Sequence, residues 1–287
     1  MSAGPWIVAA LAVLAILGSK RLPDFVQRIV LPIAAATFAC ALWHLWARST
    51  EYDVRGTDGT FTHIKVFPTP ADELPAIAEL IRSGRLLRYS VASVYRVFAG
   101  FGLAALIGIP LGLWIGWSTR ANYAFNPLIQ LLRPISPLAW IPISILCFGI
   151  DDAQKIFIIF LGAFFPIVTG TLTAVRSIPL VFVRTAENFG LRRFELFHRV
   201  VFPAALPQII TSLRIALGIG WMVVVAAEMT VTNSGLGFLV IDARNMGLRY
   251  DLVVAAMLTI GVIGVALDYM IRRLERDDEV RWGFSKS

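Results

Sequence analysis

Charged residues are scarce in this chain of 287 residues: Asp, Glu, Lys and Arg together make up 16% of it, whereas soluble domains devote about 25% of their residues to charge. Cysteine occurs twice, and both residues, Cys40 and Cys147, lie within apolar segments, a placement that indicates no disulfide framework. The three histidines, His44, His63 and His198, are too scattered to indicate a metal site. An ordinary soluble protein, a disulfide-rich protein and a histidine-based metalloprotein are therefore poor descriptions of this sequence.

Hydrophobic residues make up 57% of the chain, whose mean hydropathy is +0.72, and they are gathered into runs. Residues 156–175 contain no charged side chain, and about 20 apolar residues suffice for a helix to cross a bilayer. We therefore predict an all-α polytopic membrane protein with six or seven transmembrane helices. The expected spans are 29–47, 90–118, 127–150, 156–175, 206–230 and 252–271, with the sixteen uncharged residues of 3–18 as a marginal seventh.

Basic residues lie mainly in the connections between these runs, so membrane topology explains the net charge of +7 better than nucleic-acid binding does. Since cytoplasmic loops collect Lys and Arg, we expect the loop 177–205 and the tail 272–287 on the cytoplasmic side. Arg82, Arg85 and Arg88 then fall on the outer side, at the level of the lipid headgroups. The predicted parts are N-terminal membrane segments with an external polar linker at 1–65, an interfacial amphipathic helix at 66–89, a core at 90–271 and the tail.

Small residues recur every four positions within the span 90–118, namely Gly100, Ala104, Gly108, Gly112 and Gly116. In lipid, small residues on one face allow two helices to approach closely. Ordinary helix packing is the simpler interpretation, and a dimer or translocation interface is the alternative.

Three prolines, Pro134, Pro137 and Pro142, interrupt the span 127–150. Each proline removes a backbone donor and disturbs the preceding turn. Broken helices at membrane depth are tolerated where protein or a water-filled cavity satisfies the freed carbonyl groups. The pattern predicts either a kinked packing helix or a helix that lines a pathway.

Arg96, Arg214 and Glu228 lie within predicted spans. Each costs about 2.5–3.5 kcal/mol to insert at a central position, so we expect them to face protein or water. Arg214 and Glu228 are about 21 Å apart along one helix and cannot pair with each other. A structural role is the simpler interpretation of each: snorkelling for Arg214 and an interhelical hydrogen-bond anchor for Glu228.

The stretch "RTAENFGLRRFELFHRVVFPAALP", residues 184–207, is polar and shaped like a helix within an apolar chain. After Gly190, apolar residues recur at helical spacing, and Arg192, Arg193, Glu195, His198 and Arg199 take the other side. This predicts an amphipathic helix that lies along a surface, either on lipid or docked to a soluble partner. The apolar positions are Leu191, Phe194, Phe197 and Val201.

The sequence "ENFGLRRFELFHRVVFPAALPQIITSLRIALG" resembles the EAA loop of ATP-binding-cassette (ABC) importer permeases, which forms a cytoplasmic coupling helix. Gly190 matches the family's glycine, Phe202-Pro203 its terminal pair and Ala186 the last alanine of its Glu-Ala-Ala triplet. Arg184 departs from that pattern because it stands at the glutamate position. The stretches "LLRPISPLAWIPISILCFGIDDAQKIFIIFLGAFFPI", "VVAAEMTVTNSGLGFLVIDARN" and "FPTPADELPAIAELIRSGRLLRYSVASVYRV" are similar to permeases of the nitrate, sulfonate/taurine and bicarbonate branch.

The resemblance implies the transmembrane domain of a type I ABC importer in the cell inner membrane. It implies a homodimeric pore, two ABC ATPase subunits and a substrate-binding protein as partners. It also implies that this chain is not an enzyme and carries no cofactor, because the ATPase subunits hold ATP and Mg; the chain has no G-x-x-x-x-G-K-[ST] phosphate loop. The coupling residues it implies are Arg184, Ala186, Glu187, Gly190, Leu191, Arg192, Arg193, Phe194, Phe197, Phe202 and Pro203.

We expect Arg96, Trp140, Arg214 and Glu228 along the translocation pathway, and no catalytic or metal-binding residue. An ion-coupled secondary carrier is the alternative function, but it predicts paired repeats with matching broken helices, and the one broken segment has no evident twin. A membrane-embedded enzyme needs His, Asp, Glu or Cys clustered at one depth, and the apolar spans offer none. Nitrate, an alkanesulfonate, taurine, bicarbonate and a thiamine precursor stay open as substrates.

Overall fold

A computed structural model of the chain describes residues 24–55, 61–65, 67–230, 233–246 and 249–274. Contacts within the chain separate two units, Met1–Arg85 with Asp242–Met257, and Leu86–Ile241 with Leu258–Ser287. The predicted helix at 3–18 and most of the predicted tail lie outside the described residues.

The first unit contains α2 (Asp24–Ser49), a hairpin and α3 (Pro70–Arg82). α2 confirms the helix predicted at 29–47. In the polar linker after it, for which no strand was predicted, β1 (Glu51–Arg55) and β2 (Phe61–Lys65) form an antiparallel pair. The two strands are too short for a strong periodic signal. The pair Asp58-Gly59 between them, which is typical of hairpin turns, was the available sign.

The helix α3 lies within the stretch 66–89, for which an interfacial amphipathic helix was predicted. The backbone N–H and the hydroxyl group of Thr69 both donate to the carboxylate of Asp72, at 2.8 and 2.7 Å, and so fix the start of the helix. Leu80 is fully buried, whereas Leu74 is exposed. The chain turns at Gly84, whose φ is +68°, so residues from Arg85 onward belong to the next helix rather than to the interfacial one.

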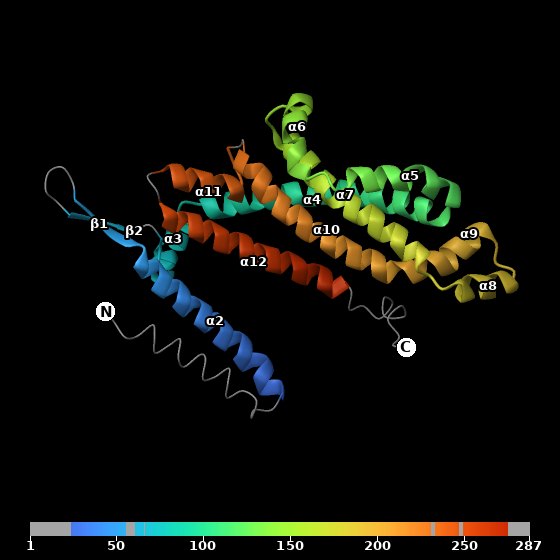
Figure 1. Ribbon diagram of the computed structural model, residues 1–287, viewed down its shortest axis with the longest axis horizontal. Coiled ribbons are helices and arrows are strands. Elements are labelled where there is room, and N and C mark those ends of the chain that lie inside the picture. Colours follow the sequence, from blue (N-terminus) through green and yellow to red (C-terminus); the bar gives the residue numbers. More distant parts are fainter. Residues whose placement is uncertain (1–23, 56–60, 66, 231–232, 247–248, 275–287) are drawn as a thin grey trace. The chain divides into compact units, whose positions relative to one another are not determined.

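The second unit is built on long helices, of which α7 and α10 lie side by side over much of their length (Figure 1). The elements after α3, some of which reach into the first unit, are α4 (Arg85–Trp117), α5 (Thr119–Leu132), η2 (Pro137–Trp140), α6 (Ile141–Phe148), α7 (Asp152–Arg176), α8 (Leu180–Asn188), α9 (Arg193–Leu196), the π-helical η3 (Phe197–Val201), α10 (Phe202–Thr230), α11 (Leu236–Asn245) and α12 (Tyr250–Leu274).

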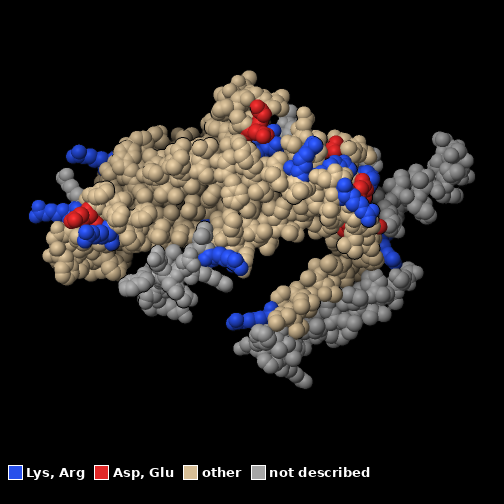
Figure 2. All heavy atoms as spheres, turned by 180° about the vertical axis from the view of Figure 1, so that it is seen from behind, with Lys and Arg blue, Asp and Glu red and all other residues tan. Residues whose placement is uncertain are grey.

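Five helices of the described chain are long and apolar enough to cross a membrane, and a bent pair can supply a sixth. This agrees with the predicted polytopic all-α fold. Figure 2 shows Lys, Arg, Asp and Glu in a few groups, with other residues covering most of the visible surface between them. The five helices run over Arg28–Ser49, Arg85–Trp117, Asp152–Arg176, Phe194–Thr230 and Tyr250–Arg273.

The span predicted at 127–150 is divided into two helical segments. α5 ends at Leu132, and the helical segment from Pro137 to Phe148 turns away from it by 87°. Pro137 opens η2 and Pro142 lies in the first turn of α6, where a missing backbone donor costs little. The broken helix that the three prolines predicted is thereby confirmed.

The small-residue stripe packs against α7 of the same chain, as the simpler interpretation predicted. A Cβ atom at Gly112 would lie 2.7 Å from the Cβ atom of Thr171, and one at Gly116 would lie 2.8 Å from that of Val175. The glycines therefore allow the backbones of α4 and α7 to approach more closely than any side chain would permit.

Candidate functional site

The loop between α7 and α10 contains a helix, a glycine turn and the extended start of α10. α8 ends in a paired hydrogen-bond pattern: Leu191 N–H donates to the carbonyl of Ala186 at 3.1 Å, and Gly190 N–H donates to that of Glu187 at 2.9 Å. This closure requires a left-handed residue, and Gly190 supplies it with φ of +86°. The turn explains why glycine stands at 190 and why the small, buried Ala186 precedes it.

The separate surface helix expected after Gly190 is wrong. The separate helix is α8, which precedes Gly190, whereas residues Phe194–Thr230 form one helix of 37 residues. Phe202 N–H donates to the carbonyl of Phe197, five residues back, and this wider turn accommodates the proline that follows. The helix therefore continues through Pro203 and Pro207.

Two of the apolar positions of this segment, Phe197 and Val201, pack inward instead of facing lipid. Val201 is fully buried in a cluster with Ala174 and Val175 of α7. Phe197 packs edge-on against Trp117 of α4, with 5.8 Å between ring centroids. The prediction of helical spacing for these residues was correct. Their apolar side chains, however, contact α4 and α7 of the same chain rather than lipid or a soluble partner.

Three aromatic side chains of the loop are exposed, and Phe182 of α8, at 56%, is the least exposed of them. Phe189 is 83% exposed and Phe194 is 78% exposed, at the end of the bundle where α7 ends and α10 begins (Figure 1). Arg184, Glu187 and Arg192 are exposed charged residues of the same loop. An apolar patch rimmed by charge is typical of a protein-interaction surface. We call Phe189, Phe194 and Arg192 the coupling patch.

A buried charge cluster lies at the opposite end of α10. Arg96 of α4 is 2% exposed and Glu228 of α10 is 1% exposed, and the Nη1 atom of Arg96 donates to the Oε1 atom of Glu228. Arg96 also donates to the carboxylate of Asp152 at 2.9 Å and to Ser234 Oγ at 2.7 Å. The buried charges of Arg96 and Glu228 are therefore compensated by each other and, for Arg96, by Asp152 as well. Asp152 and Ser234 were not predicted, because no sequence spacing links them to Arg96.

Glu228 accepts further hydrogen bonds from two elements. The hydroxyl group of Ser93 donates to its carboxylate at 2.8–2.9 Å, and Gly237 N–H donates at 3.0 Å. Gly235 has φ of +113°, and a Cβ atom there would overlap the carboxyl group of Glu228. The cluster thus joins α4, α7, α10 and the start of α11, which confirms Glu228 as an interhelical anchor.

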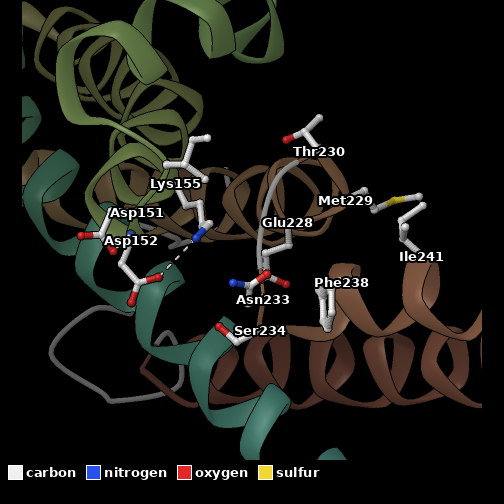
Figure 3. A pocket seen from close by; sticks show the side chains of 11 residues that line it. Asp151, Asp152, Lys155, Glu228, Met229, Thr230, Asn233, Ser234, Phe238 and Ile241 are labelled. Atoms are coloured by element: carbon white, nitrogen blue, oxygen red, sulfur yellow. Dashed lines mark hydrogen bonds and ion pairs between the residues drawn. The ribbon is translucent and has the colours of Figure 1, made fainter.

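A cavity of about 600 Å³ opens beside this cluster. Figure 3 shows Asp152, Lys155, Glu228 and Ser234 directed toward the same space. The ammonium group of Lys155 lies 3.4 Å from the Asp152 carboxylate and is almost fully buried. Because Asp151, Asp152 and Glu228 all line the cavity, acidic groups outnumber the one lining lysine.

The four predicted pathway residues do not form one site. Arg96 and Glu228 meet in the charge cluster, where each satisfies the other. Trp140 is half-buried in η2, and Arg214 is half-buried on α10 with its Nε atom 4.0 Å from the Asp268 carboxylate of α12.

Residues 108–277 match the family described as the binding-protein-dependent transport system inner membrane component. The chain belongs to this family. The match reaches from the middle of α4 beyond α12, so it includes the loop with the coupling patch and Glu228. The predicted assignment to the ABC importer permeases is therefore confirmed, and the permease is a transport component of the inner membrane.

The permease is similar to curated transport proteins over most of its length. It is 34% identical to the bicarbonate transport system permease protein CmpB of Synechococcus elongatus over 263 residues, which cover 90% of this chain and 92% of that protein. It is 38% identical to the taurine transport system permease protein TauC of Escherichia coli over 191 residues, which cover 67% of this chain and 69% of that protein.

A solved structure shares the fold. The permease resembles a chain of the inward-facing MetNI methionine ABC transporter with a TM-score of 0.52 and 20% sequence identity, covering 68% of this chain and 98% of the other. This likeness confirms the predicted fold of a type I importer transmembrane domain.

Proposed function

We propose that the permease forms half of a homodimeric pathway that imports a small anion or organic acid in an ATP-driven reaction. Nitrate, a sulfonate such as taurine, and bicarbonate are the candidate substrates, and the names of CmpB and TauC support the last two classes. A substrate-binding protein delivers the substrate from outside, and two ABC ATPase subunits bind ATP and Mg on the cytoplasmic side. The loop 177–205 and the C-terminus face the cytoplasm.

The coupling patch is the observation that carries this proposal. Phe189 and Phe194 expose apolar rings beside Arg192, in a loop whose arginines favour the cytoplasmic side. Large apolar side chains exposed together at a charged rim are stabilised when a partner covers them. A soluble ATPase subunit fits this position, since this chain has no phosphate-binding loop and takes its energy from a partner.

The continuous helix offers a mechanical link from the patch to the charge cluster. Residues Phe194–Thr230 form one helix, about 55 Å long at 1.5 Å per residue. Phe194 lies at one end and Glu228 at the other. A displacement of the coupling patch by the ATPase subunit therefore moves the anchor that joins α4, α7 and α11, which is how ATP hydrolysis reshapes the pathway.

Co-purification of the cognate ATPase subunit tests this proposal. The double variant Phe189→Ala, Phe194→Ala should lose the ATPase subunit while still inserting into the membrane. Leu146→Ala is the matched control, because Leu146 is 87% exposed but lies on α6, away from the loop. Full retention of the ATPase subunit by the double variant would refute docking at the patch. A thermal-shift screen of the cognate binding protein against nitrate, taurine and bicarbonate identifies the substrate.

A further inference from the structure

A second concavity, of about 320 Å³, lies along α7 and α10 near the end of α5. Thr169 and Thr173 of α7 line it together with Gln208, Thr211 and Ser212 of α10, and Arg133 follows α5 at its edge. We call this concavity the hydroxyl groove. Its volume falls at the lower end of the range for small-molecule sites, about 300–1,000 Å³.

The hydroxyl groove is unusual because it lies within two helices that are apolar enough to cross a membrane. Polar side chains at membrane depth face protein or a water-filled cavity, since lipid cannot satisfy them. Here three threonines and a serine gather on one surface rather than being spread around the helices. This placement indicates that the surface meets water or a polar solute.

The hydroxyl groups of the groove do not hold the helices together. Each donates to a carbonyl of its own helix: Thr169 to Phe165 at 2.8 Å, Thr211 to Pro207 at 3.1 Å and Ser212 to Gln208 at 2.8 Å. A hydroxyl group can rotate from such a carbonyl to another acceptor. The hydroxyl groups of Thr169 and Thr211 are therefore available to a solute, whereas Ser212 is buried against Gly170 of α7.

The charge of the groove is positive. Arg133 is exposed and has no acidic partner among the described residues, and the lining contains no Asp or Glu. Ser177 Oγ donates to Oε1 of Gln208 at 3.1 Å, which leaves the amide NH2 of Gln208 as a donor. The cavity beside Glu228, by contrast, is lined by three carboxylates. Of the two, the hydroxyl groove is the one that attracts an anion.

We propose that the hydroxyl groove is an anion-contact site of the translocation pathway, with Arg133 as its charged ligand. It takes a monovalent oxyanion or a small sulfonate, whose oxygens accept from the guanidinium group, the Gln208 amide and the Thr211 hydroxyl group. The inference rests on the proposed import of a small anion and assigns the contacts within the pathway.

Cysteine accessibility tests the site in the assembled transporter. Thr211→Cys is introduced after Cys40→Ala and Cys147→Ala, because both native cysteines are exposed. The probes are the anionic reagent methanethiosulfonate ethylsulfonate and its cationic trimethylammonium analogue, with rates normalised to free cysteine. A unit charge across a water-filled cavity changes local ion concentration by a few-fold, so the anionic reagent should react about threefold faster or more.

Two arginine variants decide whether the faster reaction with the anionic reagent, here called the labelling bias, comes from Arg133. Arg133→Gln should abolish the labelling bias, and Arg133→Lys should retain it. Arg120→Gln, on the exposed first turn of the same helix and outside the groove lining, should leave it unchanged. Taurine or bicarbonate at saturating concentration should slow the anionic reagent. An unchanged bias in Arg133→Gln, or no reaction of Thr211→Cys with either reagent, would overturn the proposal.

ATP-dependent uptake by the same proteins separates the two proposals. If the unmodified transporter takes up substrate without ATP, the proposed function fails, whatever the labelling shows. If its uptake requires ATP and Arg133→Gln changes neither the labelling bias nor uptake, only the hydroxyl groove fails. We expect Arg133→Gln to reduce uptake about tenfold, the effect of losing one charge-assisted contact, and Arg133→Lys to restore part of it.

Discussion

Arg96 and Glu228 are separated by 132 residues, yet their side chains form an ion pair in the interior of the helix bundle. Ser93, Asp152 and Ser234 complete the hydrogen bonds of the pair. Arg96 and Glu228, which were predicted to line the translocation pathway, therefore form an ion pair with each other. Glu228 lies near the end of the helix Phe194–Thr230, opposite the coupling patch. In the proposed conformational change, the cluster around Glu228 is therefore the outer anchor of this helix.

Breaking the pair by removing Arg96 should be strongly destabilising. Arg96→Met should lower the free energy of unfolding by about 3–5 kcal/mol, because it leaves the buried carboxylate of Glu228 without its cation. Glu228→Gln should cost less, because Arg96 keeps its ion pair with Asp152. The double variant should cost less than the sum of the two. Equilibrium unfolding in mixed micelles measures these values.

The control for the Arg96 and Glu228 variants is the exposed ion pair of Arg249 and Glu79, whose side chains are 2.8 Å apart. Arg249→Gln should cost about 1 kcal/mol or less, as surface ion pairs do. Strictly additive costs of the Arg96 and Glu228 variants would show that the two residues do not act as a pair.

The glycine stripe of α4 should tolerate substitution at some positions only. Gly112→Ala should destabilise the permease by about 1–3 kcal/mol, since the new methyl group meets Thr171 and the backbone of Val168. Gly102→Ala is the control on the same helix, because no atom lies within 4 Å of a Cβ atom there. It should be neutral or stabilising by up to about 1 kcal/mol. Equal effects of the two variants in thermal unfolding would contradict the packing of α4 on α7.

Glu73 should make the stability of the first unit depend on pH. Both carboxylate oxygens are buried without a hydrogen-bond partner in the described chain, and the residue is 3% exposed. Burial, with smaller contributions from Asp251 and Asp72, raises the pKa of Glu73 from 4.5 to about 7. The folded state therefore keeps a proton that the unfolded state releases near pH 4.5. Its stability falls as the pH rises from about 4.5 to 7 and stays low above pH 7.

The variant Glu73→Gln should remove this effect. At pH 8 it should be more stable than the unmodified permease by up to about 3 kcal/mol, whereas at pH 4.5 the difference should vanish. Glu79→Gln on the same helix removes an exposed, ion-paired carboxylate and should give no gain at pH 8. Unfolding curves of the unmodified permease and the two variants at pH 4.5 and pH 8 measure these free energies. If Glu73→Gln were no more stable than the unmodified permease at pH 8, a raised pKa of Glu73 would be excluded.

Two left-handed glycines allow coupling to be separated from stability. Gly190 and Gly84 both have positive φ, and at neither residue does an atom lie within 4 Å of the position that a Cβ atom would take. Alanine at either position should cost about 1–2 kcal/mol from backbone strain alone. Only Gly190→Ala should also weaken retention of the ATPase subunit, because only Gly190 orients the coupling patch. Equal retention by the two variants would argue against that role.

The membrane fold was readable because transmembrane helices need long apolar runs, and each predicted run within the described residues corresponds to a helix or to the broken pair. Gly190 was also readable, since its turn depends on local backbone geometry. The pairing of Arg96 with Glu228 was not, because a charge in a span requires a partner but local sequence does not identify it. The helix after Gly190 was misplaced for a related reason: Phe197 and Val201 have the same period whether they face lipid or α7.

The residues of the hydroxyl groove also could not be brought together from the sequence alone. Arg133 was visible as a charge at the start of a span, but nothing near it in sequence indicated Thr169 or Thr211. These residues meet only when α7 and α10 pack side by side. Periodicity assigns a side chain to a face of its helix, whereas the neighbour of that face is set by tertiary packing.

The most direct test of ATP-driven import is uptake into proteoliposomes that contain the permease, its ATPase subunit and its binding protein. Labelled nitrate, taurine and bicarbonate are offered in turn, with and without ATP. Uptake of at least one of them should require ATP and both partner proteins, and should survive an ionophore that collapses ion gradients. Uptake that persists without the ATPase subunit and stops with the ionophore would identify an ion-coupled carrier and contradict the proposed function.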